Sequence, residues 1–101
     1  MSIVIFGGDR LGKIPSLLKA EGFHLVHHVT GRKKSDIKTE IPREAEGVLV
    51  LVDYLNHTLA LEVKAAAKRR GVQTVFARRS WSEISRAIGA LKADAGKASL
   101  R

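Results

Sequence analysis

The chain has 101 residues, with 18 Lys and Arg against 10 Asp and Glu, and it contains no cysteine. This length suits one domain with a single core, and the lack of cysteine excludes disulfides, thiolate zinc sites and cysteine nucleophiles. The formal net charge of +8 predicts a positive field that attracts polyanions. No apolar stretch approaches the roughly 18 residues of a membrane span, and the start lacks a signal-peptide core, so we expect a cytoplasmic protein without membrane contact.

The first half of the chain predicts two strands around one helix. An apolar run over residues 2–6 is typical of a strand, and helical spacing follows over about 11–20, with Gly22 beyond its end. Residues 23–29 predict a second strand. Residues 31–46 are polar and basic, and we expect at most one or two short helical turns there.

The second half of the chain predicts two more strands, each followed by a helix. Residues 48–52 form a continuous apolar run, which is typical of a central strand covered on both faces. A helix is predicted over 58–70, a strand over 72–77 and a last helix over about 81–93, after which we expect a frayed end.

This alternation predicts an α/β fold with four parallel strands, because strands separated by crossovers run parallel with right-handed connections. We expect a single small three-layer domain over residues 1–93, with sheet order 2-1-3-4 as in half of a flavodoxin-like or Rossmann-like fold, and a flexible tail over 94–101. The carboxyl ends of the strands then meet at one edge, where open α/β sheets bind ligands.

Polar groups follow each predicted strand where it ends. Arg78, Arg79 and Ser80 precede a helix, and two guanidinium groups, a hydroxyl and a helix N-terminus favour phosphate. We therefore expect a polyanion or nucleotide as partner. The ligand-binding candidates are Gly8, Asp9, Arg10, His28, Arg32, Asn56, Arg78, Arg79 and Ser80.

A glycine-rich loop follows the first strand. Residues 7–13 fit the first seven positions of the phosphate loop G-x-x-x-x-G-K-[ST], but Ile14 replaces the hydroxyl residue that holds magnesium. The pattern favours a glycine turn that binds phosphate without hydrolysing it, or a turn that needs glycine only for its geometry. We expect no cofactor.

Asp53 and His57 are the candidates for catalysis. A carboxylate beside a histidine suits acid–base chemistry, but no nucleophile with a matching base is visible, and Asp53 alternatively orients an arginine. His27, His28 and His57 are weak metal candidates, because their spacing matches no tight ligand pattern. We therefore expect no metal.

Four separated motifs occur in an order that resembles a family of small bacterial proteins, domain of unknown function 2325. The resemblance extends from about residue 2 to residue 91 and implies a compact α/β domain in which the strand-end clusters form one unit. It brings no assigned activity, and it weakens the phosphate-loop enzyme interpretation. The motifs are Gly7-Gly8-Asp9-Arg10, His27-His28 with Gly31-Arg32, Val52-Asp53-Tyr54 with Asn56-His57, and Arg78-Arg79-Ser80-Trp81.

The leading hypothesis is a non-catalytic binding module for a phosphate-bearing ligand, either nucleic acid or a nucleotide, at the carboxyl edge of the sheet. One alternative is an enzyme that acts on a phosphate ester or nucleic acid through Asp53 and His57. Another is a dimeric partner-binding domain without ligand, joined through an edge strand or the last helix.

Overall fold

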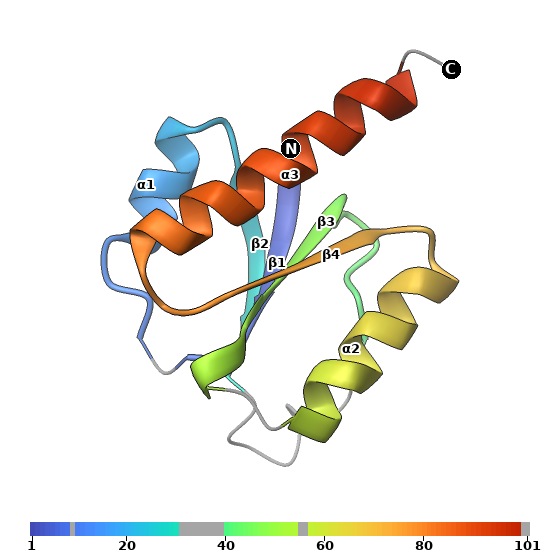
Figure 1. The fold of residues 1–101 in the computed structure, drawn as a ribbon, viewed down its shortest axis with the longest axis horizontal. Coiled ribbons are helices and arrows are strands. Elements are labelled where there is room, and N and C mark those ends of the chain that lie inside the picture. The colour runs from blue at the N-terminus through green and yellow to red at the C-terminus, as the bar shows by residue number, and fades with distance from the viewer. Residues whose placement is uncertain (9, 31–39, 55–56, 100–101) are drawn as a thin grey trace.

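A computed structural model of the protein describes residues 1–8, 10–30, 40–54 and 57–99 (Figure 1). Strands and helices alternate as the hydrophobic pattern predicts. The elements are β1 (Ser2–Phe6), α1 (Ile14–Ala20), β2 (His24–Val29), β3 (Gly47–Leu51), the 3-10 turn η2 (Val52–Tyr54), α2 (His57–Arg69), β4 (Gln73–Ala77) and α3 (Trp81–Ser99).

The four strands form one parallel sheet in the order β2-β1-β3-β4, which confirms the predicted topology. Helices α1 and α3 cover one face of the sheet and α2 covers the other, so the domain has three layers (Figure 1). Strand order reverses between β1 and β3. The loops that follow all four strands therefore lie at one edge, with the loops after β1 and β3 at its centre.

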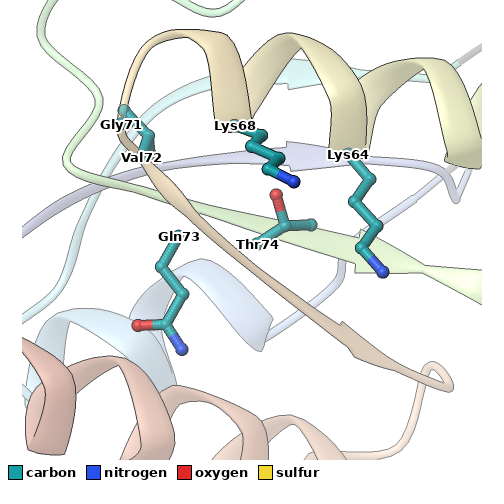
Figure 2. A pocket seen from close by; sticks show the side chains of 6 residues that line it. All are labelled: Lys64, Lys68, Gly71, Val72, Gln73 and Thr74. Atoms are coloured by element: carbon teal, nitrogen blue, oxygen red, sulfur yellow. The ribbon is translucent and has the colours of Figure 1, made fainter.

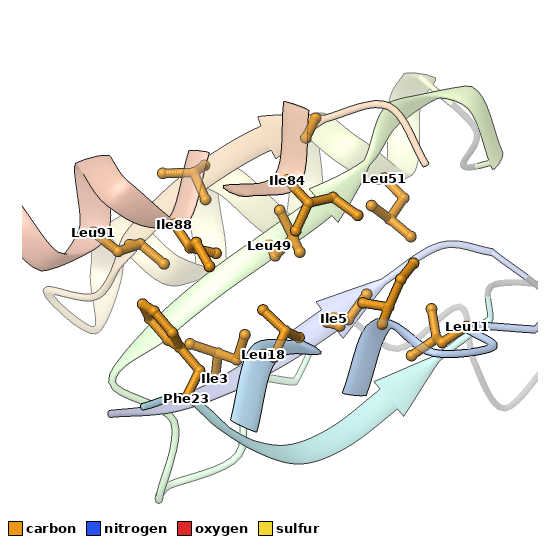
Figure 3. Packing of buried hydrophobic residues seen from close by; sticks show 13 residues of the cluster. Ile3, Ile5, Leu11, Leu18, Phe23, Leu49, Leu51, Ile84, Ile88 and Leu91 are labelled. Atoms are coloured by element: carbon orange, nitrogen blue, oxygen red, sulfur yellow. The ribbon is translucent and has the colours of Figure 1, made fainter. Parts of the chain in front are cut away.

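The core consists of two apolar clusters, one on each face of the sheet. Ile3 and Ile5 of β1 pack under α1 and α3 with Leu49 and Ile88 (Figure 3). Val4 and its neighbours on the other face pack under α2. Strands β1 and β3 supply both clusters because alternate side chains point to opposite faces, which is why β3 is apolar throughout.

Glycines set the limits of the first two helices. Gly12 has φ +56°, which is incompatible with a helical turn, so α1 begins at Ile14 and not at the predicted Leu11 or Gly12. Gly22 and Gly71 have φ +87° and +71° and end α1 and α2. Beyond each glycine the chain turns back, as when the Val72 N–H donates to the Ala67 carbonyl at 2.9 Å.

The connection before β3 is held by Arg70, the residue that follows α2. Its guanidinium donates to the backbone carbonyls of Ile41, Pro42 and Arg43. Pro42 opens a turn in which the Ala45 N–H donates to the Pro42 carbonyl at 3.0 Å. This turn agrees with the expectation of at most one or two short turns within residues 31–46, of which residues 31–39 lie outside the described residues.

Helix α3 continues to Ser99, past the end that the sequence predicts near Ala93. Its apolar stripe of Ile84, Ile88 and Leu91 is fully buried against the sheet. Beyond Leu91 the helix extends away from the sheet (Figure 1). The division into a domain over 1–93 and a flexible tail over 94–101 stays a prediction.

Candidate functional site

The loop after β1 lies at the centre of the predicted edge. Gly7 and Gly8 are buried and have φ +101° and +82°, a backbone conformation that side chains disfavour. The Gly7 N–H donates to the Val29 carbonyl at 2.7 Å, and Gly8 packs so closely on Leu51 that a methyl group there would lie 3.3 Å from its Cδ1. Glycine is thus required here by both geometry and space.

His28 fixes the same loop from β2. Its Nε2 donates to the Gly7 carbonyl at 2.8 Å. A bulge in β2 makes this bond possible: Ile3 pairs with Leu25 and Val4 pairs with His27, so Val26 is an extra residue. The bulge places the His28 side chain on the face of the sheet that α1 and α3 cover. Its pairing partner in β1, Ile5, lies on the same face. The sequence predicts His28 as a ligand contact and carries no signal for this positioning role.

Arg79 links three loops at the edge. Its backbone N–H donates to both carboxylate oxygens of Asp53, at 3.1 and 3.3 Å. Its Nε donates to the Arg10 carbonyl at 2.8 Å, and its Nη2 lies 3.6 Å from where a Cβ on Gly12 would stand. The loops after β1, β3 and β4 are therefore joined, and Arg79 itself is exposed, with no bond from its two Nη groups to another described residue.

Asp53 lies in η2 and bonds the Arg79 backbone N–H, so its predicted role of orienting an arginine side chain stays a prediction. His57 is the first residue of α2 and is exposed. Within the described part of the chain, Asp53 and His57 form no ion pair. The geometry brings Asp53 to the loop after β4 and does not join it to His57.

Four cationic side chains gather at this edge of the sheet. Arg10, Lys13, Arg78 and Arg79 are all exposed, and none forms an ion pair with a carboxylate among the described residues. At the other end of the domain, Lys92 pairs with Glu21 at 3.6 Å. Lys13 precedes α1 and belongs to this cluster, although the list of binding candidates from the sequence omits it.

Two further candidates, Ser80 and His27, have no exposed place beside the loops at this edge, and three lie outside the described residues. Ser80 is half-buried, and its Oγ lies 2.9 Å from the Ser82 Oγ. His27 is exposed in β2 on the face opposite His28, so the two rings diverge. Among the described side chains, no three His, Asp or Glu groups form a metal cluster. The candidates Asp9, Arg32 and Asn56 lie outside the described residues.

A groove that the sequence does not predict lies between α2 and β4 (Figure 2). Its volume is about 420 Å³, and Lys64 and Lys68 of α2 border it above Thr74 of β4. Gly71, Val72 and Gln73 complete the lining. The signal that could have found it is the pair of lysines four residues apart on a helix that is otherwise rich in alanine.

Fold and site together define a small three-layer α/β domain with a cationic group of loops at the carboxyl edge of a parallel sheet. The chain belongs to the family described as "Uncharacterized protein conserved in bacteria (DUF2325)", which matches residues 2–91. No curated protein and no solved structure matches the chain. Among the described residues, no helix is long and apolar enough to cross a membrane.

Proposed function

We propose that this protein is a non-catalytic cytoplasmic module that binds a phosphate-bearing ligand, nucleic acid or a nucleotide, at the carboxyl edge of its sheet. The observation that carries the proposal is the group of four exposed cations, Arg10, Lys13, Arg78 and Arg79, which lack ion-pair partners among the described residues. Unpaired cations on adjoining loops attract an anion and gain charge-assisted hydrogen bonds from it.

Arg79 is the main phosphate contact in this proposal. Its Nε is held by the Arg10 carbonyl, which leaves the Nη groups oriented at the surface beside Gly12. An arginine that is already positioned loses less side-chain entropy when it binds. Asp53 serves the site by holding the Arg79 backbone, a role that needs no proton transfer.

Titration calorimetry with pyrophosphate tests this proposal. We expect Arg79→Ala to weaken binding about tenfold or more, because a charge-assisted hydrogen bond contributes about 1.5–3 kcal/mol. Arg69→Ala is the matched control, since Arg69 is an exposed arginine at the far end of α2. Equal affinities of the two variants, or no binding by the unaltered protein, would overturn the proposal.

The protein as purified offers a second test. Ultraviolet absorbance of the native protein and of its acid-soluble extract reveals any nucleotide or nucleic acid that it retains. A homodimer through an edge strand or the last helix, α3, is a separate prediction, and the molar mass from light scattering at high protein concentration tests it.

A further inference from the structure

The groove between α2 and β4 exists because α2 packs over the middle of the sheet. Its buried side chains meet Val4, Phe6, Val48 and Val50 of the two central strands. The same face of the edge strand β4 is left open. Phe76, which pairs with Val50 in register, is 41% exposed, and Leu61 of α2 is 55% exposed. This flank therefore presents an accessible aromatic ring on rigid secondary structure.

Lysines border the same flank. Lys64 and Lys68 stand one above the other along α2, about 6 Å apart along its axis. Both extend over the groove toward β4 (Figure 2). Neither forms an ion pair with a carboxylate in the described part of the chain. A second copy of this chain is a poor occupant, since it would bring the same lysines and a net charge of +8.

The groove is continuous with the cationic edge. Strand β4 begins beside the groove and passes through Thr74 and Phe76. Two residues beyond Phe76 the chain reaches Arg78, and then Arg79. The two lysines of α2, the exposed ring of Phe76 and the two arginines therefore lie along β4 and the loop that follows it. Single-stranded nucleic acid binds to surfaces that combine cationic contacts with an aromatic ring for stacking.

We infer that the groove binds single-stranded nucleic acid, which lies along β4 and reaches the carboxyl edge. A base stacks on Phe76, and flanking phosphates contact Lys64 and Lys68. This inference rests on the proposed function and names its ligand. A duplex does not meet these requirements, because its base faces are already stacked, and an acidic peptide would satisfy the lysines but not the ring.

Fluorescence anisotropy with a labelled thymidine oligonucleotide of about twelve nucleotides tests the inference. We expect Phe76→Leu to weaken binding about tenfold, because base–aromatic stacking contributes about 1–3 kcal/mol, and Phe76→Tyr to restore it. Lys64→Gln with Lys68→Gln should weaken binding more than Lys19→Gln with Arg86→Gln. The control pair removes the same charge from exposed positions on α1 and α3.

The variants separate this inference from the proposed function. If Arg79→Ala weakens binding while the Phe76 and lysine variants bind like the unaltered protein, the edge binds phosphate and the groove assignment is wrong. If the Phe76 and lysine variants weaken binding while Arg79→Ala does not, the strand binds in the groove alone, and both the edge proposal and the path of the strand to the edge are wrong. An unlabelled duplex or a glutamate-rich peptide that competes as well as the single strand would also overturn the groove assignment.

Discussion

At Gly8, both the backbone conformation and the close packing of a neighbour disfavour a side chain. Its φ of +82° disfavours any side chain, and a Cβ would also press on Leu51. We expect Gly8→Ala to lower the free energy of unfolding by about 2 kcal/mol. Gly71→Ala should cost only about 1 kcal/mol, because Gly71 has φ +71° but open space around it. Urea unfolding measures both, and equal losses would show that the Leu51 contact is unimportant.

Thr74 carries a hydroxyl that no described residue bonds. Its Oγ1 is hidden from solvent and has no hydrogen-bond partner in the described structure. We expect Thr74→Val to raise the free energy of unfolding by about 1 kcal/mol, since the isosteric methyl removes an unsatisfied polar group. Thr74→Ser retains the hydroxyl and should not stabilise the protein. Thermal unfolding of the three proteins checks this order, and a destabilised valine variant would contradict it.

Asp53 links the loop after β3 to the loop that leads into α3. We expect Asp53→Ala to accelerate hydrogen exchange at the Arg79 amide and to destabilise the protein by about 1 kcal/mol, because that N–H loses its acceptor. Asp53→Asn keeps one acceptor oxygen and should protect the amide. Exchange measured by NMR tests this role, and an Arg79 amide unaffected by Asp53→Ala would refute it.

Arg70 plays a similar part at the other end of the domain. It holds the turn before β3 through three backbone carbonyls. We expect Arg70→Ala to lower the free energy of unfolding by about 1 kcal/mol. Arg69→Ala removes the same charge from the neighbouring exposed position and should be nearly neutral. Denaturant titration measures the free energy of unfolding of both variants. Similar losses would show that the loss of one positive charge, and not the loss of the bonds to the turn, causes the effect.

At the scale of elements, the sequence predicts the helices and strands well, because the apolar periodicity of each is clear. The continuous apolar run of β3 predicts a buried central strand, and that burial is observed. The bulge at Val26 was not predictable, because the order His27-His28-Val29 suits either face of an edge strand. Its position depends on the pairing with β1, which local pattern does not contain.

At the scale of the whole molecule, the parallel topology predicts which loops meet, but not how they bond. The arginines after β4 were predicted at the carboxyl edge, and Arg79 is there. Its bonds to Asp53 and Arg10 join residues 26 and 69 positions apart in the sequence, through a backbone N–H and a backbone carbonyl. Every residue except proline has a backbone N–H, and every residue has a backbone carbonyl. Composition and spacing therefore do not predict which backbone groups form these bonds.

Net charge makes a prediction that belongs to the whole molecule. If four to six cations contact a single strand, the logarithm of affinity should fall with the logarithm of salt concentration at a slope between about −3 and −4. This corresponds to a loss of about 50- to 300-fold between about 50 and 200 mM salt. Anisotropy titrations at several salt concentrations give the slope. A flat dependence would exclude a polyanion and favour a small ligand.

The bond from His28 to the Gly7 carbonyl makes the NMR spectrum of the His28 ring sensitive to the conformation of the glycine loop. Because a carbonyl only accepts, Nε2 must carry a proton, and the tautomer of this ring is set by the loop beside it. Nitrogen chemical shifts distinguish the two tautomers of a histidine. The ring of His28 therefore signals the state of the glycine loop without any label at the site, and a ligand that displaces the loop should change its spectrum while His24 serves as an internal reference.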